Sequence, residues 1–274
     1  MCNVFYKINM IKLVANGPGI GDAMWLSAVV EEIKRQHPDE KVRIETQFPE
    51  LYIGNPVVIE NENIQSPKMF IGLDHQENIH EHNVQFMCKQ IGLLSPEWKN
   101  IRQYFYFIES DTSPILFNEP FITIHNTPGP WTKNKSWTFR LWEELVKKIK
   151  NETSYKIVQI GGSADLKISG VDLDLLGINL RSVCKVLNQA HRHFCCVSGS
   201  MHLASACGTP STVIFGGREK PEITGYANNI NLTSSISCSP CWKIEDCPFG
   251  KYVGNDFIKP CMQEITVDMV YNTL

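Results

Sequence analysis

The sequence has no long apolar run and no basic tract. No stretch of apolar residues approaches the roughly 20 that a bilayer-spanning helix needs, so we expect no transmembrane segment. Lysine and arginine total 26, aspartate and glutamate total 29, and the formal net charge is −3. A slightly acidic chain without clustered cations is poorly suited to grip a nucleic-acid backbone. We therefore expect no nucleic-acid partner, while contact with a membrane surface stays open.

The first residues also lack the pattern of a secretory signal. Residues 1–7 lead into a strand pattern at 10–15, with no apolar stretch and no small-residue cleavage site after it. The sequence therefore predicts a cytoplasmic chain without a signal peptide. A length of 274 residues allows one large or two modest domains, each with a core of its own.

Strand patterns alternate with helix patterns in two successive blocks. The first block has strands at 10–15 and 42–46 around a helix at 23–36. The second has four strands and three helices, at 121–125, 138–150, 155–160, 180–190, 193–197, 201–207 and 211–215. Such alternation predicts an α/β fold of two doubly wound, Rossmann-like domains facing a cleft. Residues 111–120 contain two prolines and break the pattern, so we place the domains at 1–115 and 116–274.

The most informative segment is 197–216. It predicts the end of a buried strand, a Ser-Gly turn, a short helix of small residues, a Gly-Thr-Pro break and a second buried strand. A glycine turn that opens into a helix presents unpaired backbone N–H groups, and the helix dipole adds partial positive charge there. We therefore predict a phosphate-binding turn at Ser198, Gly199, Ser200 and Met201.

Two further residues belong to this prediction. His202, in the first turn of the helix, is placed to donate a hydrogen bond to the same phosphate. The alternative is a core histidine satisfied by a backbone carbonyl. Gly216 ends the following strand, and its lack of a side chain would admit a nucleotide.

A second glycine-rich turn runs from Gly17 to Asp22 and includes Gly21. Its Gly-x-Gly-x-Gly spacing differs from the G-x-G-x-x-G of dinucleotide sites, which disfavours a nicotinamide-dependent dehydrogenase. Asp22 lies at the start of the predicted helix. It is either a capping acid or a carboxylate that faces the cleft and accepts a proton from an attacking hydroxyl, and both roles are compatible.

Two loops of the second block carry candidate binding residues. Lys135 lies just before a predicted helix and between two tryptophans, where it suits a phosphate contact; the alternative is a solvated loop lysine. Gly161 and Gly162 end the next strand and allow close backbone approach. Asp165 follows them and is either a ligand for ribose hydroxyls or a plain turn acid.

The ten cysteines fall into two populations. Five lie in apolar patterns and are expected to be buried: Cys88, Cys184, Cys195, Cys196 and Cys207. Four others share a loop rich in proline, glycine and asparagine: Cys238, Cys241, Cys247 and Cys261. In a reducing compartment this spacing favours a structural zinc or iron site over disulfides, with reduced or partly paired thiols as the alternative. A zinc module for nucleic acid is disfavoured by the acidic balance of the chain.

Taken together, these motifs resemble glycosyltransferase family 9, which contains the ADP-heptose:lipopolysaccharide heptosyltransferases. The matching residues occur in the family's order, at 19–22, 135–137, 161–162, 198–204, 208–210 and 215–216. The resemblance implies a GT-B fold, here with a truncated N-terminal domain. It also implies metal-independent, inverting transfer of a heptose or related sugar from an ADP-heptose-like donor to a saccharide or protein hydroxyl, with no catalytic cofactor.

The resemblance also implies roles for single residues. Asp22 matches the general base, Lys135 and the turn up to His202 match the diphosphate site, and Asp165 with the Gly161 turn matches the nucleoside region. Cysteines near the C-terminus occur in relatives, some of which hold iron. One departure is Val197, where the family has an aspartate. It leaves open a non-catalytic nucleotide-sugar-binding protein derived from such an enzyme.

Overall fold

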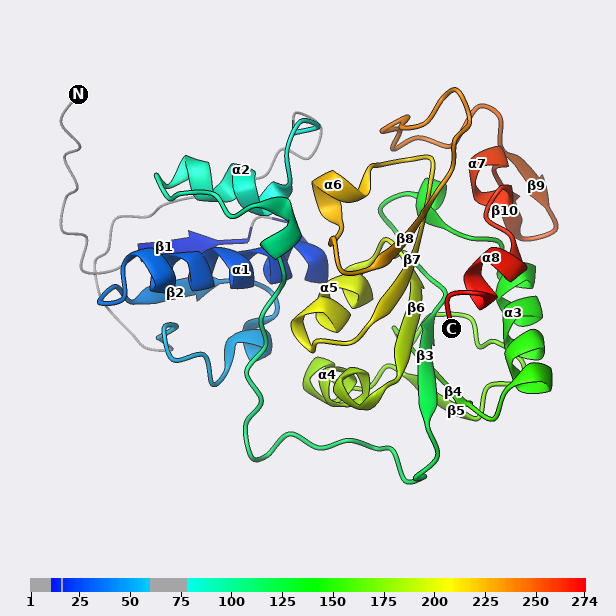
Figure 1. Cartoon of the computed structure of the whole chain (residues 1–274), viewed down its shortest axis with the longest axis horizontal. Coiled ribbons are helices and arrows are strands. Elements are labelled where there is room, and N and C mark those ends of the chain that lie inside the picture. Colours follow the sequence, from blue (N-terminus) through cyan, green and yellow to red (C-terminus); the bar gives the residue numbers. More distant parts are fainter. Residues whose placement is uncertain (1–10, 16, 60–77) are drawn as a thin grey trace.

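The computed structural model describes residues 11–15, 17–59 and 78–274 and has an α/β fold. The N-terminal part begins with β1 (Ile11–Val14), α1 (Ile20–Gln36) and β2 (Val42–Glu45). β1 and β2 pair in parallel, and Val58 adds an isolated parallel bridge to Val42. Three short helices follow: η1 (Pro49–Tyr52), α2 (Asn83–Gln90) and η2 (Trp98–Asn100). Residues 101–120 then carry no helix or strand and lead to the large sheet (Figure 1).

The C-terminal part is built on a six-stranded parallel sheet in the order β5-β4-β3-β6-β7-β8. Its strands are β3 (Phe121–His125), β4 (Lys156–Gly161), β5 (Leu173–Leu176), β6 (Arg192–Cys196), β7 (Ser211–Gly216) and β8 (Ile230–Thr233). Numbered within this sheet, the order is 3-2-1-4-5-6, that of doubly wound dinucleotide-binding folds. The order reverses between β3 and β6, and ligands of such sheets bind beyond the carboxyl ends at that point.

Helices cover both faces of this sheet (Figure 1). α4 (Leu180–Gln189) and α5 (Gly199–Ala206) lie on the face toward the N-terminal part, and α3 (Phe139–Glu152) and α8 (Val267–Tyr271) lie on the other. Local sequence explains where these helices begin: the Asn179 side chain accepts a hydrogen bond from the Ser182 N–H at the start of α4, and Thr266 caps α8 in the same way. The remaining elements are η3 (Lys133–Lys135), α6 (Pro221–Thr224), α7 (Pro260–Gln263) and the hairpin of β9 (Lys251–Val253) and β10 (Asp256–Ile258).

The larger apolar core crosses the expected domain boundary. One cluster joins buried residues of α1 and α2, such as Met24 and Met87, to Leu187 of α4 and Leu203 of α5. A second cluster lies on the other face, around Trp142 of α3. The division at 115/116 stays a prediction: the two parts share the larger core, and the C-terminal part buries the second core by itself.

Polar contacts reinforce this shared core. Arg181 of α4 forms an ion pair with Asp111 at 2.6 Å and donates hydrogen bonds to the carbonyl oxygens of Glu50 and Tyr106. His82, at the start of α2, donates from Nε2 to the carbonyl oxygen of Gly225 at 2.9 Å and accepts at Nδ1 from the Val84 N–H. Among the helices of the described residues, none is both long and apolar enough to cross a bilayer.

Candidate functional site

The first turns of α1 and α5 meet beyond the carboxyl edge of the large sheet. A Cβ on Gly199 of α5 would stand 2.8 Å from the Cβ of Ile20 in α1. A Cβ on Gly21 would stand 3.0 Å from the imidazole of His202. Glycine at both positions therefore permits the close packing of the two helices, which brings the two glycine-rich turns of the sequence together.

Asp22 lies in the first turn of α1. Its Oδ2 accepts the N–H of Gly19 at 3.0 Å, so the carboxylate does satisfy a backbone donor at the helix start. Burial lowers the pKa of Lys135, and Asp22 lies close enough for its negative charge to oppose this effect slightly. The structure thus brings Asp22 and Lys135, far apart in the sequence, to one place.

Lys135 is largely buried and forms an ion pair with Glu219 at 2.7 Å. Arg218 approaches the same Glu219 carboxylate at 3.5 Å. Burial lowers the pKa of Lys135, and the negative charge of Glu219 opposes this effect. Burial acts to raise the pKa of Glu219, but Lys135 and Arg218 outweigh it, so this pKa lies below its ordinary value.

The ring of Trp131 covers both cations. The Lys135 Nζ lies 4.9 Å and the Arg218 guanidinium carbon 4.3 Å from its centroid. Arg218 and Glu219 were not predicted as site residues from the sequence. They directly follow Gly216 and Gly217, and position after a strand at the carboxyl edge was the available signal.

His202 is buried between the two parts of the chain. Its Nδ1 shares a hydrogen bond with the hydroxyl of Tyr226, and Trp25 of α1 packs edge-on against the ring with centroids 5.2 Å apart. The other edge of the imidazole faces Gly21. The Nδ1 partner is therefore a hydroxyl instead of a backbone carbonyl. A contact from His202 to a phosphate stays a prediction.

The predicted phosphate-binding turn forms the start of α5. Ser198 is the N-cap residue, but its side chain makes no capping hydrogen bond. Met201 is fully buried, and its N–H donates to the carbonyl oxygen of Ser198 at 3.1 Å. Ser198 and Ser200 are also buried, and their hydroxyl oxygens lie 3.0 Å apart. Because Gly199 contacts Ile20, the first turn of α5 lies beside the first turn of α1, which carries Asp22.

His125, which no sequence motif marks, joins this turn to Asp165. The Nδ1 of His125, at the end of β3, lies 2.9 Å from the Ser200 hydroxyl and 3.3 Å from the Ser198 hydroxyl. Its Nε2 lies 3.2 Å from Oδ2 of Asp165. The same oxygen accepts the N–H of Gly162 at 2.8 Å. Burial acts to raise the pKa of Asp165, but these hydrogen bonds outweigh it and the pKa lies below its ordinary value.

The glycines of the sheet edge have packing explanations. A side chain on Gly161 would occupy the space of the Asp165 carboxylate and the His125 ring. Gly216 has a φ of +59°, and a Cβ there would stand 2.5 Å from the sulfur of Met262. Gly161 therefore makes room for the pair of His125 and Asp165. Met262 occupies the space beside Gly216, and the approach of a nucleotide to Gly216 stays a prediction.

The four loop cysteines line one narrow pocket of about 30 Å³. Cys261 is buried, and burial raises the pKa of its thiol; Cys241 and Cys247 are half-buried, whereas Cys238 is exposed. Within the described ranges, no three His, Cys, Asp or Glu side chains converge closely enough to hold a metal ion. The metal site is therefore not confirmed by this arrangement and stays a prediction.

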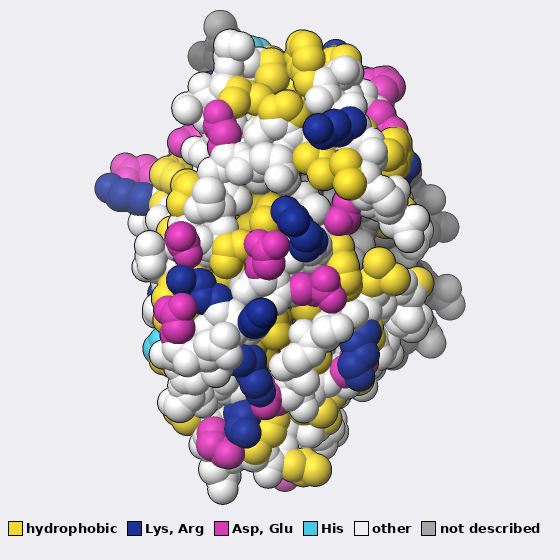
Figure 2. Space-filling view, turned by 90° about the vertical axis from the view of Figure 1, so that its right-hand side faces the viewer, with side chains coloured by type: hydrophobic (Ala, Val, Ile, Leu, Met, Phe, Trp, Pro, Cys, Tyr) yellow, Lys and Arg dark blue, Asp and Glu magenta, His cyan; other side chains and the backbone are white. Residues whose placement is uncertain are grey.

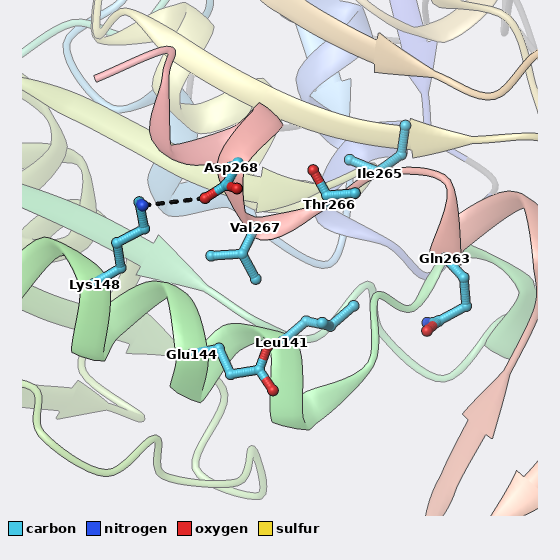
Figure 3. A pocket seen from close by; sticks show the side chains of 8 residues that line it. All are labelled: Leu141, Glu144, Lys148, Gln263, Ile265, Thr266, Val267 and Asp268. Atoms are coloured by element: carbon cyan, nitrogen blue, oxygen red, sulfur yellow. Dashed lines mark ion pairs between the residues drawn. The ribbon is translucent and has the colours of Figure 1, made fainter.

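A larger pocket, of about 410 Å³, lies away from these residues (Figure 3). Leu141, Glu144 and Lys148 of α3 form one wall, and Gln263 and residues 265–268 form the other. An ion pair of 3.1 Å between Lys148 and Asp268 spans it. The pocket contains none of the predicted site residues. On the face of the molecule that Figure 2 shows, positive and negative side chains are interspersed, without a basic patch.

Several solved structures with similar folds are glycosyltransferases. The iron-containing dodecameric glycosyltransferase TibC from enterotoxigenic E. coli H10407 matches 96% of this chain and 74% of its own, with a TM-score of 0.75 and 17% identity. E. coli ADP-heptose lps heptosyltransferase II matches 96% and 97%, with a TM-score of 0.61 and 14% identity. E. coli heptosyltransferase WaaC with ADP matches 96% of each chain, with a TM-score of 0.59 and 13% identity. No curated protein matches the sequence.

These likenesses establish the GT-B fold expected from the sequence, with fewer residues than TibC. The sequence itself gives the family. The model of "Glycosyltransferase family 9 (heptosyltransferase)" matches residues 74–253, more than half of the chain and including the Lys135 loop and the α5 turn. The chain therefore belongs to glycosyltransferase family 9.

Proposed function

We propose that this chain is an inverting glycosyltransferase that moves a heptose or related sugar from an ADP-heptose-like donor to a hydroxyl of a saccharide or protein acceptor. The observation that carries the proposal is the meeting of α1 with α5. It brings the start of α1, which carries Asp22, to the first turn of α5, at the sheet edge where the strand order reverses and within electrostatic range of Lys135. A complex of TibC with ADP-D-beta-D-heptose, a structure similar in fold, supports this type of donor.

The proposed reaction is a single displacement at the anomeric carbon. Asp22 accepts the proton of the acceptor hydroxyl, whose oxygen forms the new glycosidic bond as the bond to the donor diphosphate breaks. Negative charge grows on the leaving diphosphate, where Lys135 and the N–H groups of α5 stabilise it. We assign His202 a supporting hydrogen bond to the same group. No step of this mechanism uses a metal or a cofactor.

We further propose that the cysteine pocket binds one structural metal ion. Four thiolates suit zinc or iron in a closed tetrahedral site, and all four line the same pocket. The fold neighbour TibC is described as iron-containing. The described cysteines are free, which also supports our proposal of a reducing, cytoplasmic location.

A second candidate function is nucleotide-sugar binding without turnover. Val197 favours it, because this side chain is buried in the larger core at the position where the family has an acid. Thermal shifts with a panel of nucleoside diphosphates and nucleotide sugars would identify the donor, since a ligand that binds the folded state raises its stability. Release of the nucleoside diphosphate in the presence of acceptors then separates the two functions. Affinity without turnover would favour the binding protein, and the absence of any nucleotide ligand would refute both.

A further inference from the structure

A chain of hydrogen-bonding groups runs through the sheet at its reversal point. Five contacts of 2.9 to 3.2 Å join six side chains and branch at Ser200: Asp165–His125, His125–Ser200, Ser198–Ser200, His193–Ser200 and Thr123–His193. A longer approach of 3.3 Å lies between His125 Nδ1 and the Ser198 hydroxyl. β3 and β6, the two strands at which the sheet order reverses, carry Thr123, His125 and His193. These hydrogen bonds therefore include Ser198 and Ser200 of the predicted phosphate-binding turn.

The number of hydrogens in this chain depends on His125. With an ionised Asp165 and two neutral imidazoles, the three hydroxyls and the two rings supply five hydrogens, one for each of the five contacts. Every hydrogen is then used within the chain. When His125 takes up a proton, both its ring nitrogens donate, and one hydroxyl hydrogen becomes surplus.

The surplus hydrogen can lie on either of two hydroxyls, that of Thr123 or that of Ser198. At one end, the Thr123 hydroxyl is fully buried, and its additional acceptor is the carbonyl oxygen of Arg192 at 3.5 Å. At the other end, Ser198 is the N-cap of α5 and its hydroxyl caps no N–H. Because an anion is favoured beside a helix N-terminus, the Ser198 end gains more from a free hydrogen when a diphosphate is bound.

We propose that His125 is a positioning residue of the donor site, which on protonation turns the Ser198 hydroxyl toward the donor diphosphate. This inference rests on the proposed function, since it requires a diphosphate at the start of α5. Asp165 then acts on the donor through His125 instead of through ribose hydroxyls. It supplies a carboxylate to the turn from the loop after β4, whereas position 197 carries valine.

The charges around His125 agree with this role. From the loop after β4, the Asp165 carboxylate stabilises the imidazolium. From β6, His193 stays neutral, because burial lowers its pKa to about 3. From α5, the helix N-terminus disfavours a second positive charge until an anion arrives. Donor binding therefore favours the protonated ring, and by linkage donor binding takes up a proton.

Calorimetry of ADP-glucose binding tests the proposal. This probe carries a diphosphate diester that does not titrate near neutral pH, so proton uptake reports on the protein. The heat of binding is measured between pH 6 and 8.5 in buffers of different ionisation enthalpy. We expect the wild type to take up a fraction of one proton, and its affinity to fall as the pH rises and the ring loses its proton.

His125→Gln removes the titrating group and is expected to abolish both the proton uptake and the pH dependence, with about tenfold weaker binding at pH 6. Asp165→Asn keeps a hydrogen-bond acceptor but removes the charge, so uptake should appear at a lower pH. This variant also tests the proposal if His125→Gln does not fold. His191→Gln, at an exposed histidine stacked on Tyr155, is the matched control and should behave as wild type.

Two results would overturn the proposal, and they differ in what else they overturn. Equal proton uptake in the wild type and in His125→Gln would place the titrating group elsewhere and leave the proposed transferase function standing. If neither ADP-glucose nor any other nucleotide diphosphate or nucleotide sugar bound the wild type, the proposed function would fail together with this inference.

Discussion

Ile20 packs directly on Gly199, with the Ile20 Cβ only 2.8 Å from the place where a Cβ of Gly199 would be. This contact joins the helix that carries Asp22 to the helix whose N-terminus is the proposed diphosphate site. Ile20 takes no part in the proposed chemistry, and Gly199 contributes only its backbone to it. Their packing nevertheless fixes how far the base lies from the leaving group, and proposed catalysis should be sensitive to it.

Gly199→Ala should destabilise the fold and reduce transfer. The added methyl group meets the branched Cβ of Ile20, which has no flexible end that can move aside, so we expect a loss of about 1–3 kcal/mol in unfolding free energy. Urea denaturation measures the loss. Gly162→Ala is the control, because its Cβ would meet nothing nearer than 3.8 Å. Equal stability of the two variants would show that the helices can separate without cost.

Asp22→Asn should reduce sugar transfer by roughly 10²- to 10⁴-fold and leave ADP binding nearly unchanged. The amide can still accept the N–H of Gly19, so the start of α1 is kept while the proton acceptor is lost. Initial rates of ADP release with donor and acceptor measure the effect. Glu32→Gln, an acid on the same helix that pairs with Arg35, should retain wild-type rates. Undiminished turnover in Asp22→Asn would remove Asp22 from the role of base.

Stability should decrease in acid because of His82. Burial lowers the pKa of this histidine to about 4 from an ordinary 6.5, and its Nδ1 must stay unprotonated to accept the Val84 N–H. Between these two values the unfolded chain binds more protons than the folded one. The contribution of neutral His82 to the free energy of unfolding is therefore complete above pH 6.5. This free energy falls by up to about 3 kcal/mol as the pH falls to 4.

Urea denaturation at pH 7 and at pH 4.5 measures this loss. His82→Gln should be less stable than the wild type at pH 7, because it loses the bond to Gly225, but should lose less stability on acidification. His80→Gln, at an exposed histidine two residues earlier, is the matched control and should follow the wild type. The same acid loss in His82→Gln as in the wild type would assign the effect to other groups.

Protein purified without chelators should contain about one equivalent of zinc or iron per chain, the stoichiometry of a closed four-thiolate site. Elemental analysis measures the content. Cys241→Ser should lose the metal and some stability, since binding energy of a structural metal contributes to folding. Cys207→Ala, which changes a buried cysteine outside the cysteine pocket, should keep it. Metal-free wild-type protein of full stability would identify the four cysteines as free thiols.

The secondary structure could be predicted best where apolar periodicity was strong. The strand at Phe121–His125 was predicted with its observed limits, and α4 within one residue. α5 begins at Gly199 instead of 201, because its first residues are poor helix formers that tertiary packing holds in place. β5 and β8 were missed, since each is four residues long and mixes polar with apolar side chains.

Site residues could be predicted only where a local motif marks them. Asp22 and the turn at Ser198 follow from glycine spacing at a helix start, and the structure brings both together with Lys135. His125 and Glu219 have no such motif. Their importance depends on which strands are neighbours and on which charges are buried together, and neither is set by spacing along the chain.

The shared core of the two parts has a consequence for folding. Arg181 joins α4 to the carbonyl oxygens of Glu50 in η1 and of Tyr106, and apolar residues of α1 and α2 share one buried cluster with those of α4 and α5. Neither part can lose its structure without exposing the apolar surface of the other, so the chain should unfold as one cooperative unit. Large hinge opening between the parts would carry the same cost. Substrates should therefore enter and leave through local rearrangements at the sheet edge.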